Sequence, residues 1–386
     1  MNKIISFIKR EPVLFAAIVL ALLALIFIRP SPSLCIQAID FRTLAILFSL
    51  MIVIKAFQSQ NFLNIIAAKL LRLCKGQRGL YFLLTYLVFF ISMFVTNDVA
   101  LLTFVPITLL IFSRIGIPAL TIVVLETLAA NLGSCVTPMG NPQNLYLFSY
   151  YGFSAKEFFL LTAKIALPSF LILGAIILFI TRKKHARQGE QPQQPLQGNV
   201  LQTQMSFLTV DFRTFFYIAD FILCLLTVFH IVNYLIMLGF TIVVMLVCNF
   251  RLFKKVDYSL LLTFCGFFIF TKSLSTVQAF SDFINSMLST PLKTYITGII
   301  TSQVISNVPA ALLLSGFTTN GDMLLLGVNV GGLGTLIASM ASVISFKLYS
   351  SSEEGRSPAG KKYFGVFTVY NLALLILLAI VIYIAV

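Results

Sequence analysis

The chain has 386 residues, of which 59% are hydrophobic and only 10% are charged. A soluble core of this size cannot bury so much apolar surface, so the composition excludes a soluble globular protein and indicates an integral membrane protein in a lipid bilayer. A net charge of +14 would suggest nucleic acid in a soluble chain. Here the Lys and Arg residues fall in short clusters between apolar runs, which is typical of topology signals, and we expect no nucleic-acid partner.

The first elements follow from apolar runs and their basic flanks. Residues 13–28 follow Lys3, Lys9 and Arg10 and precede no small-x-small cleavage site, so residues 1–40 are predicted to hold a transmembrane helix and a connection. A second span is expected at residues 41–57. The basic amphipathic segment 58–78 should lie on the cytoplasmic face, which places the N-terminus in the cytoplasm.

Residues 79–114 form two apolar arms around the polar tip Thr96-Asn97-Asp98. The segment is either a pair of full spans or a re-entrant hairpin, and both alternatives return the chain to the same side. We favour the hairpin, because an Asn-Asp pair is easier to place in a cavity than against lipid.

Residues 119–151 are predicted to form a broken helix. Pro138 and Pro142 lack an N–H group, and Gly133 and Gly140 favour bends, so residues 131–144 cannot form a regular helix. The alternative is a polar loop outside the membrane, but the flanking apolar runs are each too short to span alone. Irregular backbone inside a bilayer is tolerated where protein or a watery cavity satisfies it, and in transporters it marks the binding site.

The rest of the chain repeats this order of features. A span at 158–181 leads to a Gln-rich cytoplasmic linker at 182–211, and further spans are expected at 212–229, 234–250 and 258–271. After an amphipathic piece at 273–290 come a second hairpin at 291–319, a second broken helix at 323–349 and a last span at 363–386. The fold class is therefore an all-α polytopic membrane protein, with about nine to ten transmembrane helices besides the hairpins and broken helices.

Two repeats are predicted, at residues 41–181 and 212–362. Residues 40–55 align with 257–272 without a gap, and Asn131-x-Gly133-x-x-x-Thr137 aligns with Asn329-x-Gly331-x-x-x-Thr335. The first repeat begins outside and the second inside, which indicates inverted repeats of the kind that build secondary transporters.

Four motifs in order resemble the ion transporter superfamily, which includes arsenite permeases, citrate transporters and divalent anion/sodium symporters. They are Thr96-Asn97-Asp98-Val99-Ala100, Thr137-Pro138-Met139-Gly140-Asn141-Pro142, Ser306-Asn307-Val308-Pro309-Ala310 and Gly331-Gly332-Leu333-Gly334-Thr335. The resemblance covers residues 41–349. Both tips read Ser-Asn-Thr in the sodium-coupled dicarboxylate branch, whereas the Asn-Asp pair here is more similar to the arsenite permeases.

The resemblance implies a substrate and ion site where the two hairpin tips meet the two broken helices. The residues expected there are Thr96, Asn97, Asp98, Asn131, Gly133, Thr137, Pro138, Gly140, Asn141, Asn144, Ser306, Asn307, Pro309, Asn329, Gly331, Gly332, Gly334 and Thr335. A coupling Na⁺ is expected near Asn97, Gly140, Asn307 and Thr335. The structural alternative for each Asn is a hydrogen bond that bridges two helices.

The implied function is a permease of the inner (cytoplasmic) membrane that moves a small inorganic or carboxylate anion by alternating access, coupled to H⁺ or Na⁺, and a homodimer is a further expectation. A channel or a Na⁺/H⁺ antiporter on the same scaffold is the alternative. An enzyme is not expected, because the two histidines, His185 and His230, lie on the linker and at a span end. No metal-ligand cluster, cofactor motif or nucleophile elbow is present in the sequence.

Five ionisable residues fall within predicted spans: Lys55, Asp98, Glu126, Asp220 and Lys272. Both lysines are expected to extend toward the interface, and Asp220 to pair with Arg213 or another buried cation. Asp98 is predicted to take part in coupling, the alternative being that it caps a helix starting at Val99. Glu126 lies halfway along its half-helix and has no evident structural role.

Overall fold

The structure is a computed structural model that describes residues 11–63, 76–185, 211–358 and 360–385. These residues form helices and connecting turns without strands, which confirms the all-α membrane class. Five helices are long and apolar enough to cross a membrane, or six if the bent pair α14 (Tyr258–Leu274) and α15 (Gln278–Met287) forms one span. The five fall on α4 (Phe41–Ser59), α7 (Asn97–Arg114), α10 (Ala155–His185), α13 (Tyr234–Asn249) and α21 (Tyr363–Ala385). The expected total of nine to ten spans stays a prediction.

The chain divides into two compact units. Unit 1 contains Met1–Ala56, Leu145–Ser154 and Asp211–Val328, and unit 2 contains Phe57–Asn144, Ala155–Val210 and Asn329–Val386. Each unit therefore takes chain from both predicted repeats, and the repeat boundaries stay a prediction. Most of the amphipathic segment 58–78 and of the linker 182–211 lies outside the described residues.

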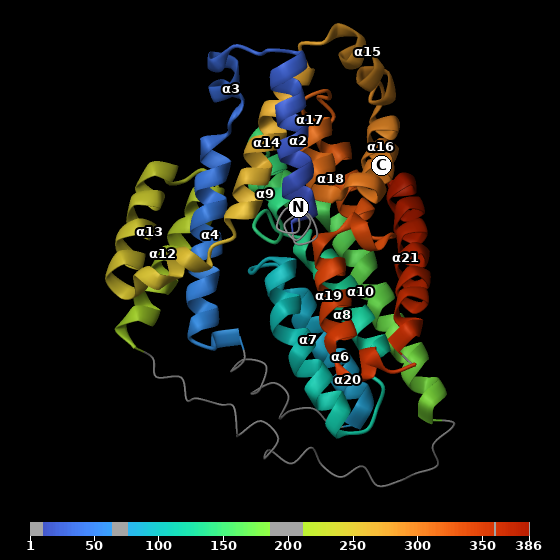
Figure 1. The fold of residues 1–386 in the computed structure, drawn as a ribbon. Coiled ribbons are helices and arrows are strands. Elements are labelled where there is room, and N and C mark those ends of the chain that lie inside the picture. The colour runs from blue at the N-terminus through green and yellow to red at the C-terminus, as the bar shows by residue number, and fades with distance from the viewer. Residues whose placement is uncertain (1–10, 64–75, 186–210, 359, 386) are drawn as a thin grey trace. The chain divides into compact units, whose positions relative to one another are not determined.

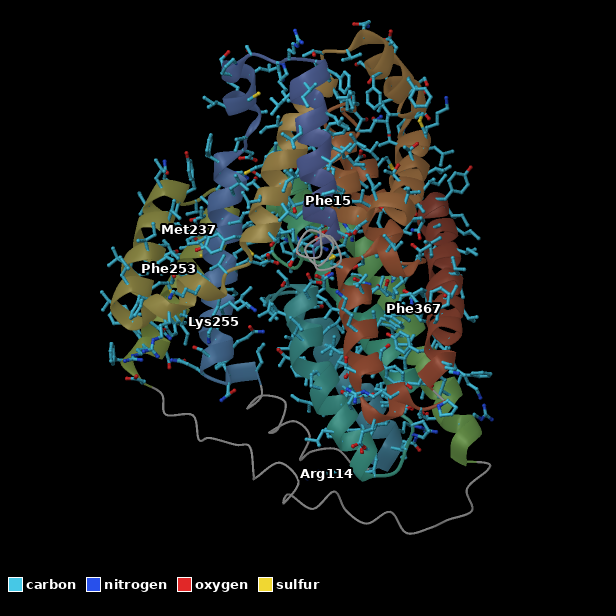
Figure 2. All side chains as sticks on the ribbon, viewed as in Figure 1. Phe15, Arg114, Met237, Phe253, Lys255 and Phe367 are labelled. Atoms are coloured by element: carbon cyan, nitrogen blue, oxygen red, sulfur yellow. The ribbon has the colours of Figure 1, made fainter. Side chains whose placement is uncertain are left out.

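Unit 1 is built around α14. Helices α2 (Pro12–Phe27), α3 (Pro32–Ala38) and α17 (Asn307–Ser315) all pack against it. The approach of α2 is close, because a Cβ atom on Gly266 would lie 3.0 Å from the Ala17 carbonyl oxygen. Helices α12 (Phe212–Val228) and α13 pack side by side as a pair, and Met237 on α13 is fully buried (Figures 1 and 2).

Unit 2 is built around α8 (Leu120–Ser134), on which every residue from 122 to 134 is buried. Because this helix is apolar on nearly all sides, it is stable only when other helices surround it. Helices α6 (Gly76–Ile91), α7, α10, α19 (Met340–Ser351) and α21 all pack against it (Figure 1). On α21, Phe367 is fully buried and its ring lies 6.0 Å from that of Tyr363 (Figure 2).

The N-terminal end of α8 is capped by a distant carboxylate. Glu354 of the short helix α20 (Glu353–Arg356) accepts hydrogen bonds from the Ala119 amide at 2.7 Å and from the Leu120 amide at 3.3 Å. The Tyr349 hydroxyl also donates to Glu354, at 3.0 Å. This carboxylate thus satisfies amides that have no partner within α8 and stabilises the positive end of the helix dipole.

Both predicted helix breaks are present. The first separates α8 from α9 (Pro142–Tyr151), and the second separates α18 (Gly321–Gly331) from α19, with a short 3₁₀ turn at Leu336–Ala338. Gly334 takes a φ of 98° there, a left-handed conformation that glycine adopts without strain. The breaks are also where the chain passes from one unit to the other, after Asn144 and after Val328.

Each of the two polar tips lies between two helices, an arrangement that fits both a re-entrant hairpin and a pair of full spans; α7 is itself long and apolar enough to cross a membrane, so the first hairpin stays a prediction. The first tip joins α6 to α7, and the second joins α16 (Pro291–Ile305) to α17 through Ser306, which has a φ of 76°. Helix α17 has nine residues, about 14 Å at 1.5 Å per residue, and cannot cross a hydrocarbon core of about 30 Å. Helix α7 begins at Asn97 with Thr96 at its N-cap, so the alternative considered for Asp98, the cap of a helix that starts at Val99, does not match the structure.

Candidate functional site

The first break is held against the first hairpin tip within unit 2. The backbone N–H of Asn97 donates to the Gly140 carbonyl at 3.2 Å, and the Thr137 hydroxyl donates to the Met93 carbonyl. Inside the break, the side-chain amide of Asn144 donates to the carbonyls of Cys135 at 3.0 Å and Thr137 at 3.2 Å. The irregular backbone that Pro138 and Gly140 impose is therefore satisfied by side chains that lie close in sequence.

Asn131, near the end of α8, connects the tip, the first break and α19. Its Oδ1 accepts from Asn97 Nδ2 at 3.2 Å and from the Ser339 hydroxyl at 2.9 Å, and its Nδ2 donates to Ser342 Oγ at 3.3 Å. Asn97 is the first residue of α7, and Ser339 is the N-cap of α19. Two helix starts therefore converge on one amide oxygen.

A second group of amides connects the two breaks. Asn141 Nδ2 donates to Asn329 Oδ1 at 3.3 Å and to Ser134 Oγ at 3.3 Å, and Asn329 Nδ2 donates to Asn144 Oδ1 at 2.7 Å. All these residues are buried. We call the whole set the amide cluster: Asn97, Asn131, Asn141, Asn144, Asn329, Ser339 and Ser342. Its bonds join separate elements, so the structural alternative considered for the asparagines, a bridging role, is also what the geometry shows.

The amide cluster is neutral, and its electrostatics come from helix ends. Neither Thr96 at the start of α7 nor Ser339 at the start of α19 accepts a hydrogen bond from its helix through its side chain. First-turn amides at such helix starts favour an anion, whereas the carbonyls that end α8 and α18 favour a cation. Within the described ranges, no three His, Cys, Asp or Glu side chains gather as metal ligands. Amide and backbone oxygens are therefore the groups available to a cation in the cluster.

The other predicted site residues lie around the cluster or in the other unit. Gly331 and Gly332 are buried beside Asn329, but Thr335 is exposed. Asp98 is half-buried in the first turn of α7, and its backbone amide donates to Asn97 Oδ1 at 3.0 Å. Gly133 packs α8 against α6, since a Cβ atom there would lie 2.1 Å from the Phe89 carbonyl oxygen.

The second tip belongs to unit 1. Ser306, Asn307 and Pro309 are buried, and the Ser306 hydroxyl lies 3.5 Å from Asn307 Oδ1. The structure thus brings the first tip and both breaks together in unit 2 and places the second tip in unit 1. The role of all these residues in binding stays a prediction.

Sequence reasoning missed the serines of α19. Ser339 and Ser342 belong to the amide cluster, and Ser345 bonds to Thr127 of α8 at 2.5 Å. The sequence does contain a signal for them, because serines recur at every third residue directly after the second break. Such spacing places them near one face of a helix that begins at the break.

Two predicted intramembrane carboxyl groups are completely buried. The Thr108 hydroxyl donates to Glu126 Oε1 in unit 2, and the Thr241 hydroxyl donates to Asp220 Oδ1 at 2.8 Å in unit 1. Arg213 pairs instead with Asp211 at 3.5 Å, so the expected pair of Asp220 with Arg213 is wrong. The side chain of Arg213 is 47% exposed, and a cation with access to water has little to gain from a buried partner.

Comparison with known proteins gives a consistent family. A family model described as a citrate transporter matches residues 4–320, a range that ends before the second break. An uncharacterized transporter of Methanocaldococcus jannaschii is 33% identical over 342 residues, which cover 87% of this chain and 88% of that protein. The inner membrane protein YbiR of Escherichia coli is 29% identical over 86% of this chain and 87% of its own length.

A shorter similarity extends to a larger protein. The human P protein is 31% identical over 131 residues, which are 34% of this chain and 16% of that protein. The matches that span most of the chain confirm the resemblance to the ion transporter superfamily. The chain therefore belongs to the citrate transporter family and is a multi-pass membrane transporter.

Proposed function

We propose that this transporter is a secondary carrier that moves a small carboxylate or inorganic oxyanion by alternating access, coupled to H⁺ or Na⁺. The observation that carries the proposal is the convergence of the α7 and α19 starts on Asn131. Two helix starts beside neutral amide donors offer N–H groups and positive dipole ends to an anion without a fixed cation. A neutral site also releases its anion more readily than one built from lysine or arginine.

The composition of the site favours a small substrate. Its polar groups come from short side chains, asparagine and serine, that bond to one another within the buried interior of unit 2. A small anion can replace some of these mutual hydrogen bonds with its own oxygen atoms. The description of the matching family as citrate transporters supports a carboxylate. The name of the relative YbiR supports placement in the inner membrane.

The proposal is tested with purified protein in lipid vesicles. Radiolabelled citrate, succinate, sulfate and arsenite are offered in turn, with imposed H⁺ or Na⁺ gradients and with protein-free vesicles as the control. We expect saturable uptake of at least one anion, counterflow against an unlabelled internal pool, and accumulation driven by one of the two gradients. Single-channel currents in a planar bilayer would instead indicate a channel. Exchange of Na⁺ for H⁺ without any anion would indicate an antiporter.

A further inference from the structure

Glu126 is a carboxyl group that the amide cluster does not use. It lies in the middle of α8 and is 0% exposed. Its Oε1 accepts the Thr108 hydroxyl, and its Oε2 has no hydrogen-bond partner among the residues that the structure describes. An ionised carboxylate in an apolar interior needs a cation or several donors, whereas the neutral acid needs few. The surroundings of Glu126 therefore suit a carboxylic acid that carries a proton.

The helices packed against α8 offer Glu126 hydroxyl groups and no cation within the described chain. Besides Thr108 on α7, Tyr363 on α21 lies close enough to Glu126 for an electrostatic interaction. On α6, Arg78 bonds to Thr181 and Tyr81 packs against the ring of Phe112. The remaining cations on the described parts of these helices are exposed or half-buried, whereas Glu126 is completely buried: Arg114 on α7, Lys156, Lys164 and Arg182 on α10, and Lys347 on α19.

A line of hydroxyl groups leads from the neighbours of Glu126 to the amide cluster. The Tyr363 hydroxyl lies 3.1 Å from Ser345 Oγ, which lies 2.5 Å from Thr127 Oγ1. One helical turn later on α8 and one turn earlier on α19, Asn131 bonds to Ser342 at 3.3 Å. The carboxyl group and the amide cluster are therefore parts of one polar seam in an otherwise apolar helix packing.

We propose that Glu126 is the proton-binding group that couples anion transport to H⁺. This inference rests on the proposed carrier function. When the seam opens to water on one side, the acid releases H⁺ there and becomes a carboxylate. After the seam has closed on that side and opened on the other, the carboxylate takes up one H⁺ and is neutral again. Asp98, which the sequence favoured for this role, is only half-buried, in the first turn of α7.

The first test measures the proton itself. We expect the infrared spectrum of the purified wild-type protein to show a protonated-carboxyl C=O band that disappears as the pH is raised, and Glu126→Gln to lack it. Asp220→Asn is the matched control, because Asp220 is equally buried and also accepts one threonine hydroxyl, in unit 1. If Glu126→Gln does not fold, Thr108→Val must shift the midpoint of the same titration, since it removes the one hydroxyl that bonds Glu126. An unchanged band in both Glu126→Gln and Thr108→Val overturns the proposal.

The second test measures coupling in lipid vesicles with labelled citrate, or with whichever of the anions above the wild type exchanges. For one proton per anion, a gradient of one pH unit supports about tenfold accumulation. We expect Glu126→Gln to exchange within about twofold of wild type but to lose this accumulation, while Asp220→Asn retains it. Accumulation by Glu126→Gln equal to wild type overturns the inference. If the wild type exchanges no anion, the carrier function fails, and the infrared titration still decides whether Glu126 binds a proton.

Discussion

Asn131 of α8 connects its helix with both α7 and α19 through one side chain. It bonds to the start of α7, to the N-cap of α19 and to a second serine of α19. An amide can serve all three because it carries donors and an acceptor at once, and neither aspartate nor leucine of similar size can. An anion bound beside this oxygen, as proposed, would displace one of these hydrogen bonds.

We expect Asn131→Ala to reduce anion exchange by at least about tenfold and to lower the free energy of unfolding by about 1–3 kcal/mol, the range for orphaned buried polar groups. The matched control is Asn371→Ala on α21. Asn371 is also fully buried, but its Nδ2 donates within its own helix, to the Phe367 carbonyl at 2.9 Å. It should lose stability and retain exchange. The measurements are initial counterflow rates and thermal unfolding midpoints, and equal loss of exchange in both variants would refute a binding role for Asn131.

At the scale of elements, the close approach of α6 and α8 depends on a glycine. A Cβ atom on Gly133 would lie 2.1 Å from the Phe89 carbonyl oxygen and 2.6 Å from Ser92 Oγ. The Phe89 carbonyl oxygen is a backbone atom of α6, so this clash can be relieved only if α6 or α8 moves. We expect Gly133→Ala to separate the two helices, lower the unfolding temperature and displace the first break.

Gly239→Ala on α13 is the control for this prediction, because no atom lies within 4 Å of a Cβ atom there. It should gain up to about 1 kcal/mol from helix propensity. Thermal unfolding of both variants in the same detergent measures the contrast. A Gly133→Ala variant as stable as wild type would show that α6 and α8 do not pack as closely as described.

The helix breaks and the turns at the two polar tips were predictable from sequence because their causes are local. Pro138, Pro142 and Gly140 change backbone geometry wherever they stand, and a polar tip between two apolar arms forces a turn. Which side chains meet across the breaks was not predictable, since Ser339 and Ser342 reach Asn131 only through the packing of α19 on α8. The start of α7 was misplaced by two residues because Thr96, rather than Asp98, occupies the N-cap.

At the scale of the whole molecule, the two contact-defined units interleave the predicted repeats. Unit 1 needs Leu145–Ser154 from the first half of the chain, and unit 2 needs Asn329–Val386 from the second half. The repeats are defined by the order in which similar elements recur along the sequence. The units are defined by which elements pack against one another. The two descriptions make different predictions about folding.

Residues 1–198 and 199–386, produced as separate polypeptides cut within the linker, should therefore fold only when they are made together. Each fragment alone lacks a segment of both units and should be degraded or aggregate. Co-expressed fragments should co-purify, resist protease and exchange anion at a rate within severalfold of the intact chain. Uncut protein carrying a protease site at the same position is the control. Stable, monodisperse folding of either fragment alone would favour the repeats as the folding domains.

The carboxylate of Glu354 also shapes the electrostatic field along α8. By capping the amides of Ala119 and Leu120, it places the chain's own negative charge where the dipole of α8 would otherwise attract a foreign one. The starts of α7 and α19, which receive no such cap from their N-cap side chains, lie at the opposite end of α8, around Asn131. The two ends of α8 therefore differ: at Ala119 the chain's own carboxylate occupies the place that an anion would take, whereas at Asn131 the starts of α7 and α19 face the carbonyls that end α8.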